Sequence, residues 1–181
     1  MGKIETPANS MPLIFYPMDE ESARAIVTWC YEAPYDIYNL NTGNADQVVS
    51  CFVDPVNAYH AIVDGEGRLV AYCCFGPDAQ VPGGDYDKPA LDVGLGVHPD
   101  LTGLGLGGTF VDAVLCFARQ ELVPSEFRVT VAEFNERAQR VWKKAHFQPV
   151  QRFERASDGA PFIILKRAAE PQGRRQVSKR L

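Results

Sequence analysis

The apolar positions of this chain follow two spacings, one typical of helices and one typical of strands. Apolar residues three or four positions apart, preceded by N-cap residues such as Asp19, indicate amphipathic helices. The predicted helices cover residues 19–29, 46–52, 109–120 and 135–145. Alternating apolar positions and β-branched runs indicate strands. The predicted strands cover residues 13–18, 57–63, 68–75, 90–98, 127–132, 147–153 and 162–165.

Glycine, proline, asparagine and aspartate mark the connections between these elements. The glycine turn 64–67 joins two predicted strands into a hairpin, and a turn over 157–159 joins the last two. Residues 31–44 and 76–88 are expected to be loops. Strands and helices then follow in the order β-α-α-β-β-β-α-β-α-β-β. This order predicts an α/β fold with a mixed sheet, because it departs from strict βαβ alternation.

Length and composition agree with one globular domain. The hydrophobic share of 46% and the charged share of 23% are average for such domains and exclude a disordered or collagen-like chain. A single domain is expected over residues 1–167, followed by a flexible basic tail over 168–181. No apolar run approaches the roughly 18 residues of a membrane span, and residues 1–10 lack the core of a signal peptide. The expected location is therefore the cytoplasm, away from membranes.

Cysteine usage and charge indicate no special ligand. The five cysteines are an odd number without the spacing of a zinc site, so we expect free thiols and no metal. The neighbours Cys73 and Cys74 have no evident histidine partner and are expected to pack in a strand rather than act as nucleophiles. The net charge of −5 divides into −11 for residues 1–100 and +6 for residues 101–181, and the end of the chain supplies most of the positive part. We expect no nucleic acid partner.

Candidate chemistry is concentrated in residues 97–108, which read V-H-P-D-L-T-G-L-G-L-G-G. Its glycines allow positive φ angles, and the N–H groups of such a turn at a helix N-terminus can hold phosphate oxygens. No Gly-Lys-Ser/Thr follows, which excludes a Walker A loop. Gly103, Gly105 and Gly108 fit a dinucleotide fingerprint with Glu126 as its acid, although the preceding strand order is not that of such a fold. A glycine-rich turn without a ligand is the third alternative.

A second segment adds specificity to the first. Residues 135–147 read N-E-R-A-Q-R-V-W-K-K-A-H-F. The strand, Pro-Asp, Gly-x-Gly-x-Gly and helix of the first segment resemble motif A of the GNAT superfamily of acetyl-coenzyme A-dependent N-acyltransferases. The second segment resembles that superfamily's second signature, Asn-x-x-Ala-x-x-Leu-Tyr-x-Lys-x-Gly-Phe. The resemblance extends over residues 12–167 and implies a mostly antiparallel mixed sheet flanked by helices.

The resemblance implies a site for acetyl-coenzyme A without a metal, built mainly from backbone N–H groups and from Asn135. The implied cofactor-binding residues are Leu95, Gly96, Val97, Thr102, Gly103, Leu104, Gly105, Leu106, Gly107, Gly108, Asn135 and Trp142. Three positions depart from the family pattern, since Thr102 stands for Gln or Arg, Trp142 for Tyr and His146 for Gly. An indole cannot supply the proton that the tyrosine of relatives is proposed to give to the leaving thiolate.

The implied reaction is direct transfer of an acetyl group to a primary amine, of a small molecule or a peptide, in a ternary complex. Asp92, at the head of the strand that leads into motif A, is expected to be the base. Aromatic and acidic side chains near the first two helices suit a cationic amine. The implied acceptor-binding residues are Trp29, Tyr31, Glu32, Tyr35 and Asp36, and Tyr38 belongs to the same aromatic and acidic cluster. A non-catalytic acyl-coenzyme A-binding module is the alternative that Trp142 leaves open, and homodimers are common among relatives.

Overall fold

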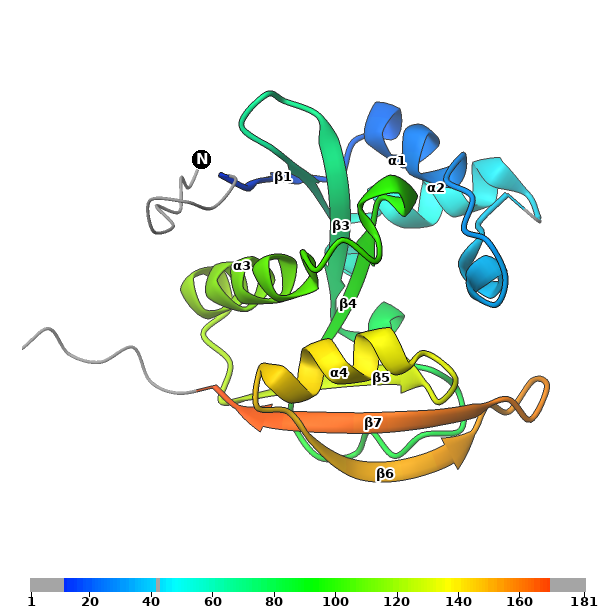
Figure 1. Cartoon of the computed structure of the whole chain (residues 1–181), viewed down its shortest axis with the longest axis vertical. Helices are drawn as coiled ribbons and strands as arrows, with labels where there is room; N and C mark the ends of the chain where they lie inside the picture. Colours follow the sequence, from blue (N-terminus) through cyan, green and yellow to red (C-terminus); the bar gives the residue numbers. More distant parts are fainter. Residues whose placement is uncertain (1–11, 42, 170–181) are drawn as a thin grey trace, which may run out of the picture.

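Seven strands form one sheet in the computed structural model, which describes residues 12–41 and 43–169 (Figure 1). The strands lie in the order β1-β2-β3-β4-β5-β7-β6. Their bounds are Ile14–Pro17 for β1, His60–Val63 for β2, Leu69–Phe75 for β3, Leu91–Val97 for β4, Glu126–Ala132 for β5, Gln148–Glu154 for β6 and Pro161–Ala168 for β7. Neighbouring strands are antiparallel except β4 and β5, which are parallel. The predicted mixed, mostly antiparallel sheet is confirmed.

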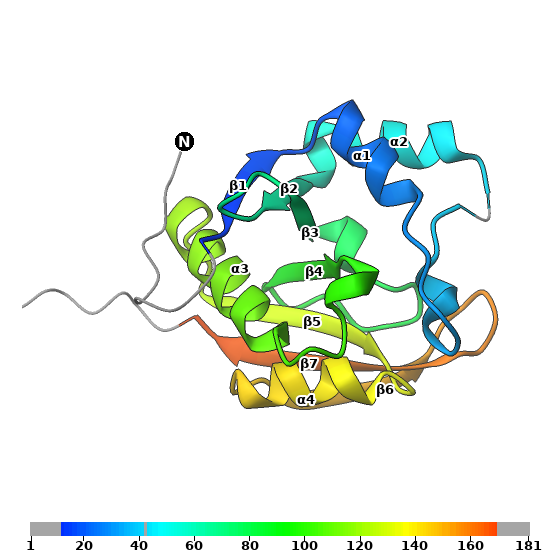
Figure 2. The same ribbon diagram turned by 45° about the horizontal axis from the view of Figure 1, so that its top comes forward.

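Helices cover both faces of this sheet (Figure 2). The α-helices of the described residues are α1 Glu20–Val27, α2 Ala45–Val53, α3 Gly107–Glu121 and α4 Glu136–Lys144, and the short 3-10 helices are η1 Tyr35–Tyr38, η2 Pro55–Asn57, η3 Pro77–Ala79 and η4 Pro99–Leu101. Ala61 and Tyr72 face α1 and α2, whereas Ile62 and Ala71, which alternate with them, face α3. The predicted order of helices and strands is confirmed. Within the described ranges, none of the helices is both long and apolar enough to span a membrane.

The largest core lies between the sheet and α3. Apolar residues of this helix that lie three or four positions apart are buried: Phe110, Val111, Val114, Leu115 and Ala118. These side chains pack against strand residues such as Phe127 and Leu165, which are fully buried. Burying each large side chain stabilises the fold by roughly 1.5–3 kcal/mol. The helix that follows the glycine-rich loop is therefore firmly anchored.

Two predicted boundaries move by a few residues. The carboxylate of Asp19 accepts a hydrogen bond from the Ser22 N–H at 2.7 Å, which confirms the N-cap, but α1 already ends at Val27. β2 begins at His60 rather than at residue 57. The three residues from Pro55 instead form η2, because proline lacks the N–H that a strand would use and suits the first position of a helical turn.

The C-terminal end of the described chain is a strand where the sequence suggested a tail. β7 extends through Ala168, which pairs with Glu126 of β5. The Arg167 guanidinium also donates to the Ala145 carbonyl at 2.8 Å. Pairing along the whole of β5 holds these residues, which corrects the tail expected from residue 168. The rest of that expected tail, residues 170–181, lies outside the described residues.

α4 ends in a Schellman motif with His146 as its left-handed residue. The His146 N–H donates to the Lys143 carbonyl at 3.0 Å, and the Phe147 N–H donates to the Trp142 carbonyl at 3.1 Å. The rings of Phe147 and Trp142 pack edge to face, with centroids 5.0 Å apart. His146 has a φ of 67° at the position that holds glycine in the GNAT signature. The backbone geometry of that glycine is therefore kept without the glycine.

We expect His146→Gly to raise the free energy of unfolding by about 1 kcal/mol, because glycine adopts a left-handed conformation without the steric cost of a Cβ atom. For a chain of this length, that gain corresponds to roughly 2–4 °C in Tm. Thermal unfolding of His146→Ala is the matched control, since alanine also removes the imidazole but keeps the Cβ atom. Equal Tm values for the glycine and alanine variants would contradict the expectation.

Candidate functional site

A cavity opens where β4 and β5 separate. The two strands share the residue pairs Leu91–Phe127 and Asp92–Arg128, and then diverge although β4 continues to Val97. The divergence is visible in Figure 2. Both strands line a cavity of about 1070 Å³, together with η1, the glycine-rich loop and α4. A volume of this size can hold a ligand larger than most metabolites.

The backbone of β4 presents polar groups to this cavity. On the β3 side, the Asp92 carbonyl accepts a hydrogen bond from the Gly76 N–H, and the His98 N–H donates one to the Val70 carbonyl. Since backbone groups of a strand alternate in direction, those of Leu95 and Val97 point away from β3. The last residue pair with β5 lies at Asp92, so no strand pairs with them on that side. Leu95 and Val97 therefore offer hydrogen-bonding groups to a ligand between the separated strands.

The two glycines of β4 allow close approach of side chains from β3. A Cβ atom on Gly96 would lie 2.3 Å from the ring of Tyr72, and one on Gly94 would lie 2.6 Å from the sulfur of Cys74. The register between β3 and β4 is continuous, so these glycines mark tight packing and not a bulge. Tyr72 thereby lies against the backbone of β4 and forms part of the cavity wall.

The loop between β4 and α3 has the geometry of an anion-binding turn. Gly103 and Gly105 have φ angles of 75° and 80°, a region that favours glycine. α3 begins after Leu106, whose side chain cannot accept a hydrogen bond, so the first N–H groups of the helix stay unpaired. Thr102 lines the cavity, but its hydroxyl donates to the Pro99 carbonyl at 2.8 Å.

Most predicted cofactor-binding residues line this cavity. They are Leu95, Gly96, Val97, Thr102, Gly103, Gly105, Gly107, Gly108, Asn135 and Trp142. Leu104 and Leu106 are not among the lining residues, and the Leu104 side chain is 64% exposed. In this loop the glycines turn toward the cavity and the leucines between them do not.

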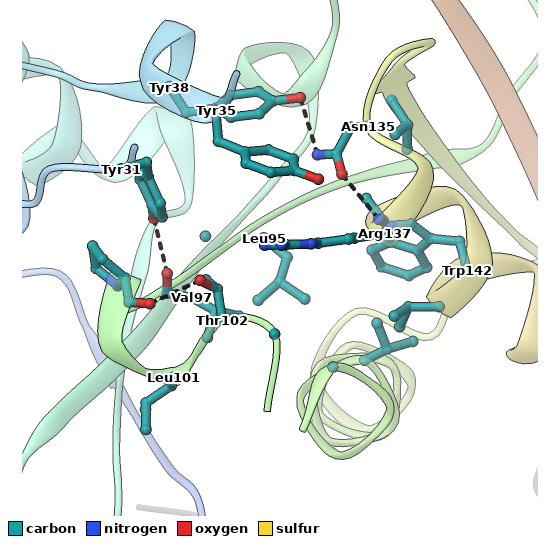
Figure 3. Close-up of a pocket in the computed structure, with 18 of the residues that line it drawn as sticks. Tyr31, Tyr35, Tyr38, Leu95, Val97, Leu101, Thr102, Asn135, Arg137 and Trp142 are labelled. Carbon is teal, nitrogen blue, oxygen red and sulfur yellow. Dashed lines mark hydrogen bonds between the residues drawn. The ribbon is translucent and has the colours of Figure 1, made fainter. Parts of the chain in front are cut away.

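The opposite wall of the cavity comes from α4 and the N-cap residue before it. Asn135 is the N-cap of α4, because its side-chain oxygen accepts from the Ala138 N–H at 3.0 Å. Its amide nitrogen donates to the hydroxyl of Tyr38 at 3.2 Å, as Figure 3 shows. Trp142 is 6% exposed and packs against Phe147 while still lining the cavity. Trp142 thus serves as a core residue and as part of the cavity wall.

Three tyrosines before and within η1 close the cavity from above β4 (Figure 3). The Tyr31 hydroxyl donates to the Val97 carbonyl at 2.9 Å, and burial raises the pKa of Tyr31 to about 12. The rings of Tyr35 and Tyr38 lie 5.8 Å and 6.2 Å from that of Phe134, between their centroids. Through these contacts η1 packs against Phe134, which lies just before the N-cap of α4.

The structure brings together part of the predicted acceptor site. Tyr31, Glu32 and Tyr35 line the cavity, whereas Trp29 and Asp36 do not. Trp29 is buried between other rings instead, and Asp36 is exposed outside the cavity on η1, so both are corrected. Tyr38, the last residue of the predicted cluster, also lines the cavity, and the prediction missed one further tyrosine of the lining, Tyr72. Nothing in the sequence singled out Tyr72.

Asp92 lies outside the cavity, contrary to expectation. It is 3% exposed, and its carboxylate accepts from Nε of Arg128 at 2.5 Å and from a second guanidinium nitrogen at 2.8 Å. The Gln80 amide donates to the same carboxylate at 2.8 Å, and the bond to Asp92 raises the pKa of Arg128. A carboxylate engaged in this way is not free to take a proton from an amine. Asp92 instead fastens β4 to β5 where they begin to separate.

The cysteines are free thiols, as predicted. Cys73 and Cys74 are buried, and burial raises the pKa of both thiols, that of Cys74 to about 12. Protonated buried thiols are poor nucleophiles, which agrees with their expected role in packing. Within the residues that the structure describes, no group of three or more His, Cys, Asp and Glu side chains is arranged to hold a metal ion.

Basic side chains of α4 form a feature of the cavity that the sequence-based interpretation missed. The lining residues include Arg137, Arg140 and Lys144 on α4, against the carboxylates Glu32 and Asp100. The spacing of three and then four positions between the three basic residues places them on one face of the helix. This spacing is a signal that the sequence did contain. The cavity therefore has a basic wall beside its anion-binding loop.

Comparisons with known proteins identify the family of this chain. The Acetyltransferase (GNAT) family has a sequence model that matches residues 20–147. No curated protein matches the chain.

Solved structures share the fold at low sequence identity. A GNAT-family acetyltransferase from Bordetella pertussis, described as putative, has 17% identity and a TM-score of 0.68, with 93% of this chain and 100% of that chain covered. A chimera of the spermidine N-acetyltransferase from Vibrio cholerae has 13% identity and a TM-score of 0.68, covering 87% and 95%. An acetyltransferase from Salmonella typhimurium, also described as putative and solved with its cofactor acetyl-coenzyme A, has 16% identity and a TM-score of 0.59, covering 89% and 96%. With the family match extending over most of its length, this chain belongs to the acetyltransferase (GNAT) family.

Proposed function

We propose that the protein transfers an acetyl group from acetyl-coenzyme A directly to a primary amine, in a ternary complex. The observation that carries this proposal is the separation of β4 from β5 beside a glycine-rich anion-binding loop. The long amide-containing arm of acetyl-coenzyme A needs the free backbone groups between the separated strands. Its pyrophosphate needs the anion-binding loop. Family membership and the acetyl-coenzyme A reported for the Salmonella typhimurium structure support the choice of donor.

The residues present fit acetyl-coenzyme A. The loop from Gly103 to Gly108 and the unpaired N–H groups of α3 would hold the pyrophosphate. The backbone groups of Leu95 and Val97 would bind the amides of the pantetheine arm, and Trp142 would pack beside it. When bound, acetyl-coenzyme A supplies a thioester carbonyl that is already activated. A backbone N–H aimed at the oxygen of such a carbonyl contributes roughly 3–4 kcal/mol to catalysis.

The acceptor would enter beside η1. The rings of Tyr31, Tyr35 and Tyr72 give this end of the cavity an aromatic lining that suits an amine. Residues 31–39 are called the acceptor loop. Of its two carboxylates, Glu32 lines the cavity and Asp36 does not, and we propose Glu32 as the base in place of Asp92. It would take a proton from the ammonium form of the acceptor, directly or through a water molecule, and leave the neutral amine to attack. Its exposure also allows that proton to pass to solvent.

Ligand binding and turnover test the proposal separately. Coenzyme A should raise the Tm of the protein and NAD should not, because the loop geometry is proposed to serve a coenzyme A pyrophosphate. Thiol release from acetyl-coenzyme A should then appear with at least one primary amine in a panel of polyamines, amino acids and peptides. Stabilisation by coenzyme A without thiol release would favour a non-catalytic binding module, which is the alternative that Trp142 leaves open. Stabilisation by NAD alone would refute both.

Gly105→Val should weaken coenzyme A binding at least tenfold in calorimetry. A valine Cβ atom would meet no neighbour within 4 Å there, so the effect arises from a φ of 80° that a β-branched residue avoids. Gly159→Val is the matched control, since Gly159 has a φ of 73°, equally open surroundings and no place in the cavity. Both variants should lose similar stability. If both bind coenzyme A as the wild type does, the loop is not the pyrophosphate site.

A further inference from the structure

The guanidinium of Arg137 lies between the glycine-rich loop and the acceptor loop. Its central carbon is 4.8 Å from the centroid of the Tyr35 ring. On the other side, a Cβ atom on Gly103 would lie 3.8 Å from one of its terminal nitrogens. In Figure 3 the side chain extends from α4 into the cavity, below Tyr35 and toward β4. One side chain thus approaches both loops that build the proposed substrate sites.

Arg137 also lies beside an anion-binding loop that has no basic side chain of its own. Residues 98–109 contain no lysine or arginine, and their charged residue is Asp100. Farther along α4, Arg140 forms an ion pair with Glu136. No ion pair with a carboxylate is found for Arg137 among residues 12–41 and 43–169. A guanidinium without a carboxylate partner, stacked on a ring, is well prepared to bind a phosphate.

On the basis of the proposed function, we infer that Arg137 binds the pyrophosphate of coenzyme A and at the same time holds the acceptor loop through Tyr35. Binding of the donor would thereby order the acceptor loop. Arg137 would supply the positive charge that Thr102 and the other loop residues lack. The two substrate sites would be coupled through a single side chain.

The contacts of η1 explain how the two substrate sites would be coupled. η1 meets the α4 side through Tyr35 over Arg137 and through Tyr38, which accepts from Asn135. An exposed arginine samples many rotamers, and the stack on Tyr35 is weakened by the entropy lost when it forms. A bound phosphate already fixes the guanidinium. Most of this entropy has then been lost before Tyr35 packs on Arg137, so the stack itself forms at a lower entropic cost. By reciprocity, an ordered acceptor loop should also strengthen donor binding.

Calorimetry on Arg137→Gln tests the phosphate contact. We expect the variant to bind coenzyme A about 10- to 100-fold more weakly, as loss of a charge-assisted hydrogen bond pair predicts. Dephospho-coenzyme A, which keeps the pyrophosphate but lacks the 3′-phosphate, should show the same loss, while pantetheine should show none. Lys143→Gln is the matched control, because Lys143 lies on the same helix but does not line the cavity, and it should bind nearly as the wild type does. A loss seen with coenzyme A but not with dephospho-coenzyme A would overturn the pyrophosphate assignment.

Hydrogen exchange tests the coupling. Saturating coenzyme A should slow amide exchange in residues 31–39 of the wild type, and this protection should be largely lost in Arg137→Gln and in Tyr35→Leu at saturating coenzyme A. Equal protection in wild type and Arg137→Gln would overturn the coupling. Normal coenzyme A affinity of Arg137→Gln would overturn the phosphate contact. If the wild type itself fails to bind coenzyme A, the proposed function fails, and that result is distinct from both.

Discussion

Asp92→Asn is expected to lower the free energy of unfolding by about 3–5 kcal/mol, because it leaves the Arg128 guanidinium buried without a counter-charge. Arg128 is 2% exposed and Asp92 is 3% exposed, so water cannot replace the lost carboxylate. For a chain of this length, the loss corresponds to a drop in Tm of roughly 6–20 °C. Denaturant unfolding followed by circular dichroism measures it.

The double variant Asp92→Leu/Arg128→Met separates the structural role from a catalytic one. It removes both charges at once, so it should recover most of the lost stability. Well below the lowered Tm, coenzyme A affinity of Asp92→Asn should stay close to that of the wild type. Wild-type stability combined with a large loss of kcat in Asp92→Asn would show that the carboxylate is a base after all.

Glu32→Gln is expected to lower kcat/KM at neutral pH by about 10²-fold, the usual contribution of a general base. A primary amine with a pKa near 10.4 is almost wholly protonated at pH 7, so the reaction needs a group that accepts its proton. As the pH rises, more of the amine is neutral without help, and the difference between variant and wild type should shrink. Steady-state rates between pH 7 and about 10 give this profile.

Asp36→Asn is the matched control for Glu32→Gln. Asp36 lies four positions away in the same loop and is exposed, but it does not line the cavity. The two variants change the net charge equally, so a purely electrostatic attraction of a cationic amine would affect both. A wild-type kcat/KM for Glu32→Gln at neutral pH would place the base elsewhere. A pH-independent rise in KM alone would indicate that Glu32 binds the amine without deprotonating it.

Local patterns predicted much of the fold and most of the residues by which the glycine-rich loop and α4 line the cavity. The helix predicted over residues 109–120 and the N-cap predicted at Asp19 depend on residues within a few positions of each other, and both are confirmed. Gly103 and Gly105 also adopt the positive φ angles that such a turn requires, because a preference for positive φ is a property of single residues. Even the basic face of α4 can be predicted from spacing once the helix is recognised.

The chain by itself therefore determined its elements, their order, the glycine-rich loop and the family, because each depends on short-range spacing. Only the tertiary structure decided which side chains from distant elements contact one another. Asp92 looked available in the sequence, but Arg128, 36 positions away in the chain, occupies both of its oxygens. Arg137 came to lie between Tyr35 and Gly103 because the separation of β4 from β5 sets α4 opposite η1. Contacts of this kind depend on strand register and on packing between distant segments, which no local pattern encodes.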